Sequence, residues 1–123
     1  MPWDGKTSYS MSETHDSNAQ ELEALLQTLW KSSRPTLLER LETLRDAQSK
    51  LAAGCLDDQT RKDAEAAAHK LAGVLGTFGL PEGSKLASQI EAMLAPEAEL
   101  DTEHWRALGE SVDRLEAVIA SKP

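Results

Sequence analysis

The sequence predicts an all-α fold, an antiparallel up-and-down four-helix bundle with an additional N-terminal helix. Apolar residues recur at three- and four-residue spacing in five segments, the pattern of amphipathic helices. Aromatic residues make up only 4% of the 123 residues, and a core dominated by Leu and Ala favours helix packing over sheet formation. Because the segments are joined by only a few residues, consecutive helices are expected to be antiparallel neighbours.

The first two helices are expected on either side of Pro35. Ser17 or Asn18 can cap the first helix, which is expected to end at residues 32–34. Pro35 suits the first turn of the second helix, and Gly54 suits its C-terminal end. Their apolar stripes are Leu22, Leu25, Leu26, Leu29 and Trp30 in the first helix and Leu37, Leu38, Leu41, Leu44 and Leu51 in the second.

Three further helices are expected over residues 58–78, 81–95 and 101–121. Gly79 ends the first of these, and Pro81 begins the next.

The N-terminal residues 1–16 are polar and lack helical periodicity, which predicts a mobile tail. The domain boundaries that follow are a tail over residues 1–16 and a helical bundle over residues 17–121.

The overall charge narrows the classes of partner. The formal net charge is −8, which argues against binding to nucleic acid or to an anionic membrane surface. A protein partner is expected to be neutral or basic where it makes contact. The single cysteine, Cys55, excludes an intrachain disulfide and favours a cytoplasmic location. No apolar run approaches the roughly 20 residues that a membrane-spanning helix needs.

Residues 65–80 contain an unusual combination of helical periodicity and glycine. A projection at about 100° per residue places the buried stripe at Ala64, Ala67, Ala68, Leu71, Leu75 and Phe78. The opposite face carries His69 together with Lys62, Ala66, Gly73 and Gly76. A glycine inside a helix costs roughly 0.5–1 kcal/mol relative to alanine. We therefore expect the two glycines to keep the face around His69 open to an approaching partner.

The run Ala68-His69-Lys70-Leu71-Ala72-Gly73, followed by Gly76-Thr77-Phe78-Gly79, resembles the signature of histidine phosphotransfer (Hpt) domains of two-component phosphorelays. Its ending is similar to the phosphotransfer domain of chemotaxis-type histidine kinases. The residues that match the family pattern are His69, Leu71, Gly73 and Gly79. Ala72 departs from it, because the family usually has a lysine there.

The resemblance implies a phosphocarrier without kinase activity of its own. His69 would accept a phosphoryl group and transfer it to or from an aspartate of a response-regulator receiver domain, or accept it from a histidine kinase. No cofactor and no ATP site are expected, since the chain has no Gly-rich phosphate loop. A monomer is expected.

Glu91 is the candidate for orienting the imidazole of His69. The two residues lie ten positions before and twelve positions after Gly79, so an antiparallel hairpin puts them at similar heights. A hydrogen bond to one ring nitrogen makes the other nitrogen the nucleophile. Lys70 is a secondary candidate for screening phosphoryl charge. The residues expected to leave room for a docking partner are Ala66, Ala72, Gly73 and Gly76.

Blander interpretations stand beside this hypothesis. A lone histidine on a helix is most often a solvated surface residue, as expected for His15 and His104. The alternative function is a non-catalytic adaptor bundle that binds receiver or kinase domains, with Ala72 as its sign; a helical oligomerisation domain is a further possibility. No metal site is expected, because no histidine or cysteine pair has ligand spacing.

Overall fold

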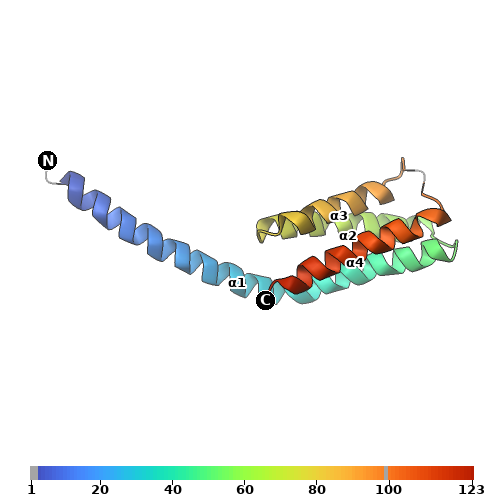
Figure 1. Ribbon diagram of the computed structural model, residues 1–123, viewed down its shortest axis with the longest axis horizontal. Helices are drawn as coiled ribbons and strands as arrows, with labels where there is room; N and C mark the ends of the chain where they lie inside the picture. Colours follow the sequence, from blue (N-terminus) through green and yellow to red (C-terminus); the bar gives the residue numbers. More distant parts are fainter. Residues whose placement is uncertain (1–2, 99) are drawn as a thin grey trace. The chain divides into compact units, whose positions relative to one another are not determined.

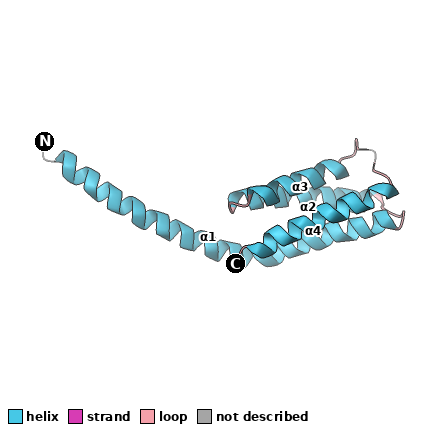
Figure 2. Cartoon of the chain, viewed as in Figure 1, coloured by secondary structure: helices cyan, strands magenta, loops and turns pink. Residues whose placement is uncertain are grey.

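A computed structural model describes the backbone of residues 3–98 and 100–123 and the side chains of residues 18–98 and 100–123. Every regular element in these residues is a helix (Figure 2). The elements are α1 (Trp3–Ala52), α2 (Asp58–Thr77), α3 (Pro81–Leu94), the short 3₁₀ helix η1 (Thr102–His104) and α4 (Trp105–Ser121). The predicted all-α class is therefore confirmed.

The chain divides into two compact units, residues 1–34 and residues 35–123. The second unit is the bundle, in which residues 35–52 of α1 pack with α2, α3 and α4 (Figure 1). Its core is almost entirely aliphatic, and the largest fully buried side chains are Leu37, Leu44, Leu71, Leu75, Ile90, Leu94, Leu108, Val112, Leu115 and Ile119. The predicted four-helix packing is confirmed.

The predicted additional N-terminal helix is wrong, because α1 continues through residues 32–34 with Pro35 inside it. A proline inside a helix removes one backbone donor and costs about 3 kcal/mol. No glycine accompanies Pro35 to end the helix, and the Leu, Glu, Gln and Lys residues on either side favour the helical state. The hydroxyl of Ser32 also donates to the carbonyl of Leu29 at 3.0 Å in the turn before the proline.

Residues 18–34 are the part of the first unit whose side chains are described. Trp30 is fully buried there, whereas Leu22, Leu25 and Leu29 have exposed fractions of 56%, 54% and 44%. Most of the apolar stripe predicted for this segment is thus exposed. The backbone of residues 3–16 belongs to α1, although the sequence predicts no helix there. Their side chains lie outside the described residues, and the mobility of the tail over residues 1–16 stays a prediction.

A tight turn joins α2 to α3. Gly79 has a φ of 73°, a left-handed conformation that glycine adopts at little steric cost. The backbone N–H of Leu80 donates to the carbonyl of Leu75 at 2.9 Å, and Pro81 begins α3. The two helices are therefore antiparallel neighbours from this turn onward.

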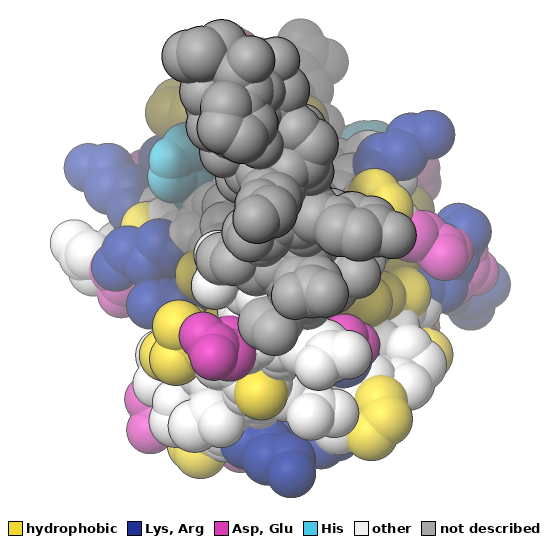
Figure 3. All heavy atoms as spheres, turned by 90° about the vertical axis from the view of Figure 1, so that its left-hand side faces the viewer, with side chains coloured by type: hydrophobic (Ala, Val, Ile, Leu, Met, Phe, Trp, Pro, Cys, Tyr) yellow, Lys and Arg dark blue, Asp and Glu magenta, His cyan; other side chains and the backbone are white. Residues whose placement is uncertain are grey.

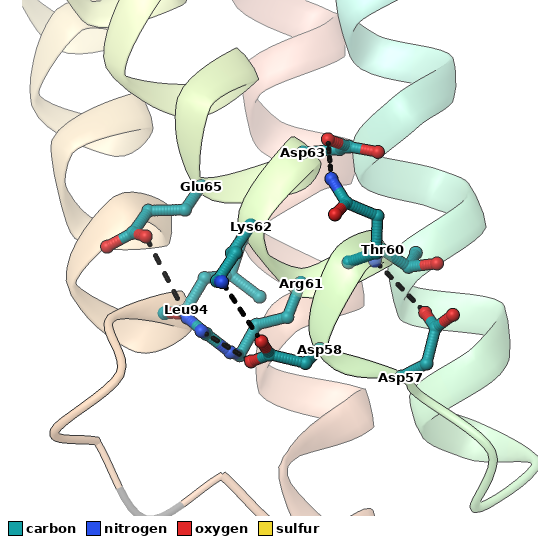
Figure 4. A network of polar contacts seen from close by, with 9 residues as sticks. Asp57, Asp58, Thr60, Arg61, Lys62, Asp63, Glu65 and Leu94 are labelled. Atoms are coloured by element: carbon teal, nitrogen blue, oxygen red, sulfur yellow. Dashed lines mark hydrogen bonds and ion pairs between the residues drawn. The ribbon is translucent and has the colours of Figure 1, made fainter.

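The other end of this hairpin is held by Arg61 (Figure 4). Its guanidinium donates to the carbonyl of Leu94 at 2.7 Å and to Asp58 at 2.9 Å. Leu94 is the last residue of α3, where backbone carbonyls lack helical partners and the helix dipole attracts a cation. The side chain of Arg61 is only 15% exposed, so this link is shielded from water.

The start of α2 is capped by Asp57. Thr60 donates to the Asp57 carboxylate through its side chain and through its backbone N–H, and these bonds hold the pKa of that carboxyl below its ordinary value. The backbone bond measures 3.0 Å. Asp57 therefore satisfies one of the N–H groups that a helix start leaves without a partner.

Close packing fixes α3 against its two neighbours at Gly83. A Cβ built on this glycine would lie 3.1 Å from Leu75 Cδ1 on α2 and 3.1 Å from Val118 Cγ1 on α4. On the other side of the bundle, Arg45 of α1 donates to Asp113 and Glu116 of α4 at 2.9 and 2.8 Å. These contacts set the register of the four helices.

We predict that Arg61→Ala lowers the free energy of unfolding by about 1–3 kcal/mol, because the shielded carbonyl of Leu94 loses a charged donor. Urea denaturation measures the change. Lys62→Ala is the matched control: its exposed pair with Asp58 contributes at most about 1 kcal/mol. Equal effects of the two substitutions would contradict a special role for Arg61.

Candidate functional site

His69 and Glu91 meet across the α2–α3 hairpin. Nδ1 of His69 lies 2.9 Å from Oε2 of Glu91. A carboxylate can only accept hydrogen bonds, so Nδ1 carries the proton and donates it. In the neutral imidazole Nε2 then keeps its lone pair. The imidazole is 74% exposed and the Glu91 side chain 33%, so the free nitrogen belongs to a ring that solvent and a partner can reach.

The hairpin explains this juxtaposition. His69 and Glu91 lie at similar distances from the turn at Gly79, as their offsets in the sequence predict. Nearer the turn, the hydroxyl of Ser84 donates to the carbonyl of Ala72 at 2.7 Å. The hairpin is thus linked by polar contacts beside the pair, and its apolar core lies beneath.

The face around His69 is open. A Cβ added at Gly73 would meet no atom within 4 Å, and one added at Gly76 would meet only Ser84, at 3.5 Å. Ala66 is exposed as well. Helix packing therefore does not require a glycine at Gly73 or Gly76.

Ala72 differs from the other three predicted docking residues. It is half-buried, and its carbonyl accepts the Ser84 hydrogen bond. It consequently lies on the side of α2 that faces α3 rather than on the open face. No cation occupies this position, where the Hpt pattern has lysine.

Two lysines on α2, Lys62 and Lys70, differ in their position relative to His69 and in their ion pairing. Lys70 is exposed and projects about 100° around the helix from His69. Lys62, two turns before His69, forms an ion pair with Asp58 at 3.2 Å. Lys70 is thus the nearer of the two to the histidine along the helix, although it does not share the face of the imidazole.

Ser84 and Arg61 are residues that sequence reasoning missed. Ser84 lies five residues after Gly79, opposite Gly76 in the hairpin, so the offset from the turn could have indicated it. Arg61 gave no comparable signal, because its partner is a backbone carbonyl. Both residues support the geometry of the hairpin rather than contacting the imidazole.

His104 provides a contrast to His69. Its Nδ1 lies 2.8 Å from Oδ1 of Asp101, and the two residues form the capping box of η1. This imidazole is 48% exposed but its bonding is explained by the cap. The side chain of His15 lies outside the described residues.

A separate open pocket of about 490 Å³ lies where the α1–α2 and α3–α4 connections meet. It is lined by Leu51, Gly54, Leu56, Asp57, Asp58, Arg61, Pro96, Ala98, Leu100, Asp101 and Thr102. None of the predicted site residues lines it. Among the residues whose placement is described, no three His, Cys, Asp or Glu side chains gather where they could hold a metal ion.

None of the helices in the described part of the chain combines the length and the apolarity that crossing a membrane requires.

Comparison with known proteins identifies the class of protein that this bundle represents. Residues 19–118 match the Hpt domain family, so the chain belongs to the histidine phosphotransfer domains, as its sequence signature predicts. Such domains act in phosphorelays as phosphocarrier modules rather than as autonomous kinases, and they typically interact with receiver domains.

A similar protein is RcaC of Microchaete diplosiphon, which is 35% identical over 89 residues. The match covers 72% of this chain but only 14% of that protein. The chain therefore corresponds to a small part of its relative. A comparison with solved structures finds no match.

The tautomer of His69 can be tested directly. We predict that ¹⁵N NMR of the imidazole shows the Nδ1–H tautomer in the unmodified chain, because Glu91 accepts that proton. Glu91→Ala should raise the fraction of the Nε2–H tautomer, whereas Glu91→Gln, whose amide oxygen can still accept, should preserve the original one. An unchanged tautomer in the alanine variant would show that Glu91 does not orient the ring.

Proposed function

We propose that this chain is a phosphorelay intermediate that carries a phosphoryl group on Nε2 of His69. The observation that supports this best is an exposed imidazole whose Nδ1 is held by the Glu91 carboxylate at 2.9 Å. That bond leaves the other nitrogen available as a nucleophile on a face that two glycines keep open.

The proposed step is an in-line transfer. The Nε2 lone pair attacks the phosphorus of an aspartyl phosphate, the bond from phosphorus to the aspartate oxygen breaks, and the receiver carboxylate leaves. The phosphorylated ring then carries a positive charge. Glu91 supplies a negative charge next to Nδ1–H, where it stabilises that cation. Transfer to a second receiver aspartate runs the same step in reverse.

Lys70 has a secondary role in this proposal, since it is the nearer lysine on the same helix and can screen phosphoryl charge. Ala66, Gly73 and Gly76 let the partner approach, with Ala72 at the edge of that surface. The partner is a receiver domain of a response regulator, and a histidine kinase is a second source of phosphate. We place the carrier in the cytoplasm and expect it to act as a monomer.

The rival is an adaptor bundle that binds receiver or kinase domains without phosphoryl transfer. The observation that favours it is that position 72 holds alanine, where the Hpt pattern has lysine. An adaptor has no need for a free Nε2, however, so the orientation of the imidazole favours the carrier.

We predict that the chain acquires an acid-labile, alkali-stable label when it is incubated with phosphorylated receiver domains, and that His69→Gln abolishes this label. The measurement is transfer of radioactive phosphate followed by acid and alkali treatment. His104→Gln is the matched control and should keep full labelling, because that exposed histidine has a capping role. Absence of label on the unmodified chain with every receiver tested would favour the adaptor.

We predict opposite effects of Gly73→Leu on stability and on transfer. The added side chain enters open space, so better helix propensity should raise the free energy of unfolding by about 0.5–1 kcal/mol. Its bulk on the face of His69 should slow phosphoryl transfer by at least about tenfold. Gly73→Ala should give a similar gain in stability with little loss of transfer. Destabilisation by leucine would show that the glycine is needed for packing.

A further inference from the structure

The charge around His69 differs from the charge of the chain as a whole. Residues 65–92 contain two lysines and three glutamates, whereas the complete chain has a formal net charge of −8. Glu91 is hydrogen-bonded to His69, and Glu65, one turn before His69, pairs with Arg61 at 3.8 Å. The segment that carries the site is therefore less acidic than the chain as a whole.

Both lysines of this region, Lys70 on α2 and Lys85 on α3, are exposed. Neither makes an ion pair within the described part of the chain. This is unlike the pairs of Lys62 with Asp58 and of Arg45 with α4. Unpaired ammonium groups remain fully available to carboxylates on another molecule.

The two lysines border the outer face of the hairpin. Lys85 directly follows Ser84, whose hydroxyl contacts α2 at Ala72. Ser88, one turn after Lys85 on the same side of α3, is exposed. Lys70 lies about 100° around α2 from His69. Exposed lysines thus stand on both helices that carry the site, Lys70 beside His69 on α2 and Lys85 six residues before Glu91 on α3.

The charges on α2 and α3 contribute most to the electrostatic interaction with a partner that docks on these two helices. The Debye length is about 8 Å at physiological ionic strength, and packed helices lie about 8–10 Å apart. Acidic groups on α1 and α4 are consequently screened from a partner that docks on α2 and α3. Figure 3, which looks at the molecule from the left-hand side of Figure 1, shows Lys and Arg side chains interspersed with Asp and Glu, so the net charge does not describe every part of the surface.

We propose that Lys85, together with Lys70, selects a partner whose docking surface is acidic. This inference rests on the proposed phosphocarrier function and refines it: the net charge of the chain favours a neutral or basic partner, whereas the face that carries His69 favours carboxylates. Lys85 acts in docking and not in the chemical step. It lies on the helix that carries Glu91, but its side chain forms no hydrogen bond or ion pair with His69 or Glu91.

The test compares Lys85→Glu with Arg114→Glu, a matched change of charge at an exposed position on α4. The probe is the phosphorylated receiver domain that labels the unmodified chain fastest. Lys85→Glu should lower the second-order rate of transfer about three- to tenfold at low salt. The rate for the unmodified chain should fall as salt rises, less steeply in the Lys85 variant. Arg114→Glu should change neither quantity.

Phosphoramidate, a small donor that does not dock, separates the two proposals. Labelling of His69 by phosphoramidate should be equal in all three proteins. If Lys85→Glu keeps the full receiver rate and the same salt dependence, the docking role is wrong and the phosphocarrier function stands. If Lys85→Glu slows phosphoramidate labelling as well, the lysine acts on the phosphoryl group rather than on a partner, which also overturns the proposal. If neither phosphoramidate nor any receiver labels the unmodified chain, the proposed function itself fails.

Discussion

The register between α2 and α3 is the constraint on which the candidate site depends. A slide of one residue along either helix, about 1.5 Å, would disturb a 2.9 Å contact between His69 and Glu91. The chain prevents such a slide at several points. Gly79 makes the turn at one end, Arg61 holds the last carbonyl of α3 at the other, and the close approach at Gly83 locks the helices between them. The exposed chemistry is therefore positioned by contacts that are largely shielded.

The site itself is sparse, and that suits a carrier. A phosphoryl group that must be accepted and then released should not be held by many groups, since strong binding of the intermediate would slow the second transfer. In the proposed mechanism the protein supplies one oriented nucleophile, His69, and one compensating carboxylate, Glu91, while Ser84 beside them bonds to backbone. Any further stabilisation in the transition state would come from the partner. Alanine at position 72, where the Hpt pattern has lysine, is consistent with stabilisation of the phosphoryl group by the partner.

Much of the bundle could be predicted from sequence because its signals are local. Leucine spacing determines which helix faces are buried, and the glycine–proline turn determines where α2 ends and α3 begins. The offsets of His69 and Glu91 from Gly79 likewise predicted that the two residues lie at the same height in the hairpin, and they are in contact. Reasoning from local signals failed at Pro35, since a proline indicates a boundary only when neighbouring residues also favour one, and here they favour a helix. It also could not find Arg61, whose partner is a carbonyl 33 residues away. The offset of Ser84 from the turn indicates its height in the hairpin but not the carbonyl of Ala72 as its partner. Contacts between side chains and backbone leave no residue-type pattern.

The two glycines on the open face also imply a limit on how stable this domain can become. Each sits in a helix interior where almost any other residue would favour the folded state, and neither is needed to bring helices together. Selection for thermal stability alone, in the laboratory or in a hot environment, would fill these positions early. Under the proposed docking role, the need for a second protein to reach this surface keeps the chain from an accessible gain in stability.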